Sequence, residues 1–120
     1  MTDISLRIRQ LQPLRPAVFH ILLVLSDGER HGYAVKQEVE RRTNGVVKMG
    51  PGTLYESIQR MVENALIEEA PRRQHRQNDQ GQRRYYRLTS FGKQVLQAEV
   101  TRLADIVDYA RSSLRGTKPA

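Results

Sequence analysis

The sequence predicts a mainly α-helical fold with one small β-hairpin, and three observations support this prediction. Apolar residues recur at helical spacing in three segments between residues 16 and 66. Two short strand-like segments flank an arginine-rich polar stretch, and a long segment with heptad spacing ends the chain. A chain of 120 residues buries too little surface for two cores, so we expect a single core.

The first of the three helical segments, residues 16–25, is apolar on nearly every side. A helix of this kind must be enclosed by other elements, so we expect it at the centre of the core. Pro16 suits the first turn, where a backbone N–H has no acceptor within the helix. His20 lies on this segment, and we expect it to be a hydrogen-bonded core residue.

A second helix is expected over residues 32–43, ended by Asn44-Gly45, because both residues tolerate the left-handed backbone conformation. Residues 46–49 follow as a short extended linker. Gly50-Pro51 then begins a third helix, in which apolar residues at helical spacing are predicted to face the core: Leu54, Ile58, Met61, Val62 and Leu66.

The opposite face of the third helix carries small polar side chains that form hydrogen bonds. Any surface helix has a polar face, but a helix also fits the major groove of B-DNA, where its N-terminal half reaches base edges and phosphates. We predict that this face and one residue of the linker before the helix bind DNA: Lys48, Gly52, Thr53, Ser57, Gln59 and Arg60.

Two short strands, 66–70 and 83–88, are expected to flank an exposed loop that has no apolar residue except Pro71. The strands and loop contain six arginines against one acid in residues 71–87: Arg72, Arg73, Arg76, Arg83, Arg84 and Arg87. In isolation a basic loop is simply solvated. Placed beside a polar helix, it predicts a wing that contacts the DNA phosphates and supplies affinity rather than sequence specificity. The net charge of +7 agrees with a polyanionic partner.

The last helix is expected from about residue 91 to residue 114, with Thr89 as its N-cap. Apolar residues follow it at alternating spacings of four and three: Leu96, Val100, Leu103, Val107, Ala110 and Leu114. Such a stripe is a heptad seam, and one small core leaves much of it uncovered. We therefore predict a homodimer seam. Packing against residues 16–25 of the same chain is the alternative.

These elements together predict a winged helix-turn-helix DNA-binding domain in residues 14–90, followed by a C-terminal dimerisation helix in 91–115. Residues 1–13 form an N-terminal arm, and 116–120 a tail. The arm has apolar residues at helical spacing, and we expect it to lie on a partner subunit: Ile4, Ile8 and Leu11.

Three stretches resemble the PadR family of transcriptional regulators in its short form. His31-Gly32-Tyr33-Ala34-Val35 resembles the second helix of that family. Gly50-Pro51-Gly52-Thr53-Leu54-Tyr55 resembles its recognition helix, and Arg83-Arg84-Tyr85-Tyr86-Arg87-Leu88-Thr89 resembles its wing strand and the entry to its dimerisation helix. The resemblance implies a homodimer that binds double-stranded DNA at an inverted-repeat operator, represses its target genes and leaves DNA when a small-molecule effector binds.

The resemblance also implies roles for individual aromatic residues. Tyr33 is expected near the DNA backbone, and Tyr55 at the start of the recognition helix. We expect Tyr85 in the core and Tyr86 at the surface as a DNA contact. Glu56 stands where the family usually has proline. It would repel a phosphate unless it accepts from a cytosine amino group or a neighbouring arginine, and we include it among the DNA-binding residues.

A pocket for the effector is predicted between the terminal helices and the core helix, with Phe19 and Tyr109 as candidate lining residues. The alternative to DNA binding is a winged-helix module that binds another protein. Such a module has no need of six arginines in its wing, so we favour DNA.

Other classes of function find no support in the sequence. The three histidines, His20, His31 and His75, lack metal-ligand spacing, and no nucleophile or phosphate-loop motif is present, so we expect neither an enzyme nor a metal or cofactor. Cysteine is absent, no secretory signal is visible, and no apolar run is long enough to span a membrane. We therefore expect a cytoplasmic protein.

Overall fold

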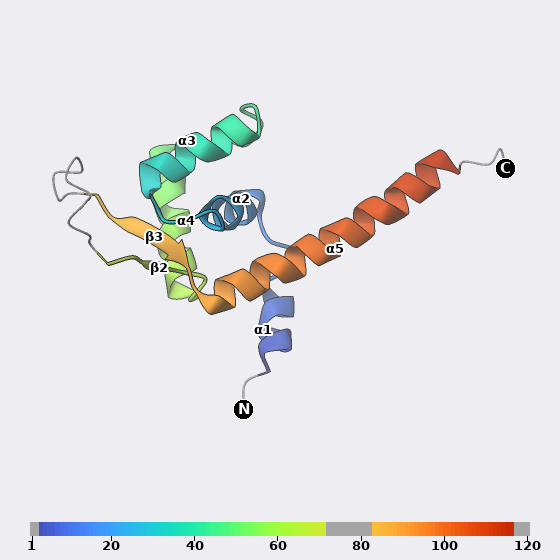
Figure 1. Cartoon of the computed structure of the whole chain (residues 1–120), viewed down its shortest axis with the longest axis horizontal. Helices are drawn as coiled ribbons and strands as arrows, with labels where there is room; N and C mark the ends of the chain where they lie inside the picture. Colours follow the sequence, from blue (N-terminus) through green and yellow to red (C-terminus); the bar gives the residue numbers. More distant parts are fainter. Residues whose placement is uncertain (1–2, 72–82, 117–120) are drawn as a thin grey trace.

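The computed structural model describes residues 3–71 and 83–116, and the statements below concern these residues. Figure 1 shows helices clustered beside a small sheet, with one long helix extending away from them. The elements in chain order are α1 (Ile4–Leu11), α2 (Pro16–Leu25), β1 (Arg30–His31), α3 (Gly32–Arg42), α4 (Pro51–Glu63), β2 (Ile67–Glu69), β3 (Tyr85–Leu88) and α5 (Ser90–Arg115). The prediction of a mainly α-helical chain with a small β-structure is confirmed.

Helix α2 is the centre of the core, as its uniformly apolar sequence predicts. It packs against α3, α4, α5 and β3, and Ile21 and Leu22 are completely buried. Pro16 occupies the first turn. His20 was expected in the core, but it is only half-buried, with its ring edge-on to Phe19 at a centroid distance of 5.5 Å.

Helix α3 ends where the sequence predicts, because the next residues adopt left-handed backbone conformations. Asn44 has φ 52° and Gly45 has φ 79°. The backbone N–H of Gly45 donates to the carbonyl of Glu40 at 2.8 Å and so satisfies one of the last carbonyls of the helix. The chain then passes through an irregular segment to α4, with Met49 buried beneath it.

The sheet has three antiparallel strands in the order β1-β3-β2, whereas the sequence predicted only the hairpin of β2 and β3. Strand β1 was missed because two residues give no periodic signal. The register places Arg30 opposite Tyr86 and Ile67 opposite Leu88. Tyr86 and Leu88 share a face of β3 because side chains alternate along a strand.

The expected positions of the two strand tyrosines are therefore wrong. Tyr86 is only 8% exposed and belongs to the core, while Tyr85 is half-buried on the other face, edge-on to the ring of His31. Because β3 is the central strand, one of its faces lies on the hydrophobic core. In this register Leu88 lies opposite Ile67, and Tyr86 lies opposite Glu69. Tyr86 and Leu88 are therefore on the same face of β3, and that face lies on the core.

Helix α5 begins at Ser90, and the Thr89 hydroxyl accepts a hydrogen bond from the N–H of Gly92 at 2.9 Å, which confirms the predicted N-cap. Its first turns pack on α2 and β3, and its second half extends beyond the core (Figure 1). Helix α1 confirms the helical spacing of the N-terminal arm and packs against α5 of its own chain. Among the described residues, no helix has the length and apolarity needed to cross a membrane.

Candidate nucleic-acid interface

Helix α4 has one buried face and one exposed face. Leu54, Ile58 and Met61 are buried, as their helical spacing predicts. Val62 was also expected in the core, but its side chain is exposed. The buried stripe runs through positions 54, 58 and 61, so position 62 lies at its edge, beside the groove between α4 and the sheet.

The residues predicted to bind DNA lie along the exposed side of α4. Ser57 is half-buried, and the others are exposed: Gly52, Thr53, Tyr55, Glu56, Gln59 and Arg60. Lys48 is exposed in the segment before the helix. Gly50 is the N-cap and has no side chain to accept from the first N–H groups of the helix. This end of α4 therefore carries the partial positive charge of a helix N-terminus.

The acid on this face, Glu56, has a cationic neighbour one turn away. Its carboxylate lies 3.6 Å from the Arg60 guanidinium, and both side chains are well exposed. An exposed pair of this kind adds only about 0.3–0.5 kcal/mol to stability. Its consequence is electrostatic, because Arg60 offsets the charge with which Glu56 would repel a phosphate.

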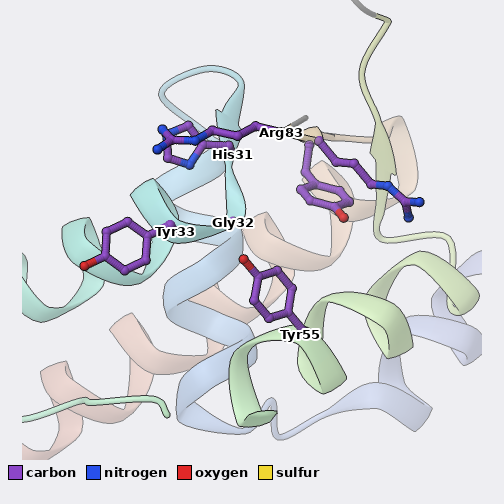
Figure 2. A pocket seen from close by; sticks show the side chains of 7 residues that line it. His31, Gly32, Tyr33, Tyr55 and Arg83 are labelled. Atoms are coloured by element: carbon purple, nitrogen blue, oxygen red, sulfur yellow. The ribbon is translucent and has the colours of Figure 1, made fainter. Parts of the chain in front are cut away.

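A cavity of about 360 Å³ lies where the N-terminus of α3, helix α4 and the start of β3 meet. Figure 2 shows its side chains, which come from three separate stretches of the sequence: His31, Gly32, Tyr33, Tyr55, Arg83, Arg84 and Tyr86. The fold thus brings together five residues that the sequence assigns to DNA binding. Arg72, Arg73 and Arg76 lie outside the described residues.

A second groove, of about 410 Å³, lies on the other side of Tyr55, between α4 and the sheet. It shares three residues with the cavity: Tyr55, Arg84 and Tyr86. Burial raises the pKa of the Tyr86 hydroxyl, and the charge of nearby Glu69 acts in the same direction, so this hydroxyl stays protonated at neutral pH.

His31 is the residue of this site that the sequence-based prediction omitted. Its Nδ1 accepts the backbone N–H of Ala34 at 3.1 Å, so the histidine is the N-cap of α3. Its Nε2 lies 2.9 Å from Nη1 of Arg83. A polar residue directly before a helix is a recognisable N-cap signal, but histidine is not among the usual capping residues.

Gly32 allows α3 to approach α4 closely at this cavity. A Cβ atom on residue 32 would lie 3.1 Å from Cε1 of Tyr55 and 3.3 Å from Cδ1 of Ile58. Both contacts are tighter than ordinary packing. The glycine therefore lets the Tyr55 ring lie directly against the start of α3.

A network of ion pairs fixes the far end of α3. The guanidinium groups of Arg41 and Arg42 donate to Glu38 and lower the pKa of its carboxyl to about 2, and Arg42 also pairs with Asp27 in the turn after α2. These two arginines are held by acids of their own chain. The positive charge of α3 near Arg41 and Arg42 is thus largely neutralised.

The predicted dimer seam divides into two parts. Leu96 is only 6% exposed and belongs to the core of its own chain, because the first turns of α5 pack on α2, so its assignment to the seam is wrong. Farther along α5, Leu103 and Ala110 are half-buried, and three residues of the seam have exposed side chains: Val100, Val107 and Leu114.

Glu99 is a buried acid that the sequence-based prediction did not single out. It is 1% exposed and accepts hydrogen bonds from Arg102 at 2.8 Å and from the backbone N–H of Leu14 at 2.9 Å. The Arg102 guanidinium lowers the pKa of the Glu99 carboxyl against the opposing effect of burial, and the Leu14 N–H acts with it. Glu99 thereby ties α5 to the segment between α1 and α2.

The two candidate effector-pocket residues line neither of the cavities described above. Phe19 is half-buried against the core, and Tyr109 is 78% exposed on the projecting part of α5. Among the described residues of a single chain, Tyr109 is therefore left largely uncovered.

Comparison with known proteins agrees with this architecture. Residues 21–98 match the family described as "Transcriptional regulator PadR-like family". The protein named "Uncharacterized protein X" from Lysinibacillus sphaericus is 35% identical over 96 residues, which are 80% of this chain and 85% of that protein.

Solved structures share the fold at lower identity. A PadR family transcription regulator from Clostridium difficile has 23% identity and a TM-score of 0.64, over 83% of this chain and 98% of that one. Bacillus subtilis PadR, solved in complex with operator DNA, has 21% identity and a TM-score of 0.59, over 72% of this chain and 47% of that one. The predicted winged helix-turn-helix fold with a long C-terminal helix is confirmed. The family match shows that this chain belongs to the Transcriptional regulator PadR-like family, whose members are regulators of transcription and not enzymes.

Proposed function

We propose that the protein is a homodimeric repressor that binds an inverted-repeat operator, with α4 in the major groove and the wing along the phosphate backbone. The observation that carries this proposal is the exposed polar face of α4, which lies next to a cavity lined by Arg83 and Arg84. In the similar Bacillus subtilis PadR, the structure was solved with operator DNA. Residues 14–90 would form the DNA-binding unit.

Base recognition is assigned to the first three turns of α4. Thr53, Ser57 and Gln59 can donate to or accept from base edges, and Arg60 can form two hydrogen bonds with a guanine. Gly52 has nothing within 4 Å of its Cβ position, so the DNA backbone can come close there. The pairing of Glu56 with Arg60 makes the approach of this face to DNA less repulsive.

The wing is assigned to phosphate binding. Arg83 and Arg84 are exposed at the base of β3, and the sequence places Arg72, Arg73 and Arg76 in the loop. Arg87, by contrast, is paired with Glu68 at 2.8 Å and with Glu29 at 3.8 Å. Phosphate contacts would give the complex its dependence on salt concentration.

The contact with a second copy of the chain is assigned to the projecting part of α5, within residues 91–115. Three exposed side chains of the seam, with Ile106 beside them, give this helix an apolar surface: Val100, Val107 and Leu114. Burial of such side chains is favourable by roughly 1.5–3 kcal/mol each before entropy is subtracted. A two-fold dimer would present two α4 helices to two half-sites, as an inverted repeat requires.

A small molecule that releases the protein from DNA would bind at the dimer interface. There the α5 helix of one subunit would cover α2 of the other. Phe19 and Tyr109 would then line a pocket formed by residues of both subunits. A ligand bound there would change the separation of the two α4 helices, and the affinities for ligand and DNA would be linked.

Selection of duplexes from a random pool by the full-length protein tests the proposed function. The expected product is an inverted repeat whose half-sites are about 34–36 Å apart, one helical turn. A pool that shows no enriched sequence, together with capture of a protein partner through the α4 face, would instead favour a protein-interaction module.

A further inference from the structure

We propose that Glu56 and Arg60 together read one C·G base pair in each operator half-site. The Glu56 carboxylate accepts a hydrogen bond from the N4 amino group of cytosine, and the Arg60 guanidinium donates to O6 and N7 of the paired guanine. The inference rests on the proposed DNA-binding function and deepens it, because it names the base pair that α4 recognises and gives the acid of this face a role.

Glu56 points directly away from the core. An α-helix turns by about 100° per residue, and Glu56 lies two residues after buried Leu54 and two before buried Ile58. Its side chain is therefore on the opposite side of α4 from both, and it is 70% exposed. Gly52, one turn earlier on the same line, has no side chain. In a helix that enters the major groove, Glu56 is thus the first long side chain on this line to reach the base edges.

A carboxylate at this position contributes little to the fold. The first turn of α4 contains no acidic residue and Glu56 lies beyond it, so its charge interacts only weakly with the helix dipole. The exposed pair with Arg60 also adds little to stability. In a protein of net charge +7, an acid on the groove-facing side weakens the attraction to phosphates. A donor on a base would offset this cost, and the N4 amino group of cytosine is the donor that carboxylates contact in the major groove.

The separation of the two side chains matches the edge of one base pair. Oε1 of Glu56 lies 3.6 Å from Nη2 of Arg60. This distance is longer than an N–H···O hydrogen bond, so each group keeps its capacity for another partner. In a G·C pair the cytosine N4 and the guanine O6 are themselves hydrogen-bonded, at about 2.9–3.0 Å. A carboxylate and a guanidinium held side by side therefore face a donor and an acceptor at a similar spacing.

An A·T pair also places an amino group beside a carbonyl oxygen, but it suits these two side chains less well. Guanine presents two acceptors, O6 and N7, on one edge, and they match the fork of an arginine. Thymine presents one acceptor, O4, next to a methyl group. Arg60 therefore selects guanine, and Glu56 selects the cytosine opposite it.

The test combines two modified bases with three variants. In the selected operator duplex, each cytosine of a half-site is replaced in turn by N4-methylcytosine, which blocks the N–H in the major groove but keeps the base pair. Each guanine is replaced in turn by 7-deazaguanine, which lacks the N7 acceptor. Binding is measured for the wild type, Glu56→Ala, Arg60→Ala and Glu63→Ala.

Glu63→Ala is the matched control for Glu56→Ala. Glu63 lies two turns after Glu56 on the same side of α4 and is also exposed. It is the last residue of the helix, away from the N-terminal part that reaches base edges. Both variants remove one negative charge from an exposed position and introduce a good helix former, so both should fold.

At one C·G pair per half-site, each modified base is expected to weaken wild-type binding about tenfold. There Glu56→Ala should lose the response to N4-methylcytosine, and Arg60→Ala should lose the response to 7-deazaguanine. Both variants should also lose about tenfold of the wild-type preference for C·G over A·T at that pair. Glu63→Ala should keep both responses and the preference.

Two results would overturn the inference and leave the proposed function intact. The first is a wild type that selects an inverted repeat in which no cytosine responds to N4-methylcytosine. The second is a Glu56→Ala or Arg60→Ala protein that keeps the full response to its own modified base, since its missing side chain would then contact no such base. A wild type that enriches no sequence at all would overturn the proposed function, and this inference with it.

Discussion

Gly92 lies against the backbone of Leu66 so closely that a Cβ atom on residue 92 would be 1.9 Å from the Leu66 carbonyl oxygen. The same carbonyl accepts from the backbone N–H and the hydroxyl of Thr89, so it is held in place. Gly92 is thus the point at which α5 meets the end of α4 and the start of β2.

Gly92→Ala is expected to destabilise the protein by at least about 1–3 kcal/mol, because α5 must move away from a fixed backbone group rather than from a flexible side chain. Denaturant unfolding measures the change. Gly52→Ala is the matched control, since nothing lies within 4 Å of its Cβ position, and its free energy of unfolding should stay the same or rise. Equal unfolding midpoints for the two variants would show that the contact is not rigid.

Glu99 gives the fold a defined sensitivity to acid. Its pKa in the folded protein is lowered from the ordinary 4.5 by Arg102 and the Leu14 N–H. A carboxyl with a lowered folded pKa stabilises the folded state above its unfolded pKa, and this contribution is lost as pH falls through the folded value. Stability from Glu99 should therefore be complete at neutral pH and decline below about pH 4.5.

Glu99→Ala is expected to cost about 2–3 kcal/mol at neutral pH, because it leaves the N–H of Leu14 without its buried acceptor and Arg102 without its partner. Urea unfolding at neutral and acidic pH measures both effects. The loss caused by the substitution should shrink as the pH is lowered. Glu63→Gln, at an exposed carboxyl on α4, is the control and should change little at either pH. A loss that is constant with pH would contradict the role of the Glu99 charge.

Much of the fold follows from local sequence patterns. The uniformly apolar segment 16–25 had to be enclosed, and Asn44-Gly45 had to end α3, so both were predictable from short-range physical chemistry. The Thr89 cap was predictable for the same reason. Leu54, Ile58 and Met61 were correctly placed by helical spacing alone.

The errors arise where tertiary contacts decide. Tyr85 and Tyr86 are adjacent residues of one type, and only the pairing of β3 with strands on both sides fixes which of them faces the core. Leu96 continues the heptad spacing of the seam, but the core of its own chain covers it first. The contact of His31 with Arg83 joins residues 52 positions apart, and no local pattern reports it.

The face of α4 should read sequence, and the wing should not. Ser57→Ala or Arg60→Ala is expected to lower specific affinity much more than nonspecific affinity, by ~1–3 kcal/mol for each lost base contact. Arg73→Ala or Arg76→Ala should weaken both alike and reduce the salt dependence by about one unit per lost phosphate contact. Titrations of selected and random duplexes at several salt concentrations separate the two patterns. The opposite pattern would exchange the assigned roles.

An effector of the proposed dimer should act without touching DNA. A screen of aromatic and cationic compounds is expected to find ligands that lower operator affinity, and Tyr109→Ala should abolish that response while leaving operator affinity in the absence of ligand unchanged. Calorimetric titration of the ligand with and without operator should show the same coupling in both directions. A response that Tyr109→Ala leaves intact would place the ligand elsewhere.

The projecting part of α5 should be essential for operator binding although it lies away from the DNA-binding face. Val107→Asp places a carboxylate in the exposed seam and is expected to separate the subunits, because a buried unpaired charge costs several kcal/mol. The side chain is exposed in a single chain, so each monomer should stay folded. Ser112→Asp adds the same charge on the opposite face of the helix and is the control.

The most direct test of a dimeric operator-binding protein is sedimentation equilibrium of the three proteins mixed with the selected operator duplex. The wild type and Ser112→Asp should form complexes with two chains per duplex. At the same concentrations Val107→Asp should sediment as a free monomer, because it loses the gain from occupying two half-sites at once. A wild-type complex that saturates with one chain per duplex, or a monomeric Val107→Asp that binds the operator as tightly as the wild type, would contradict the proposed dimer.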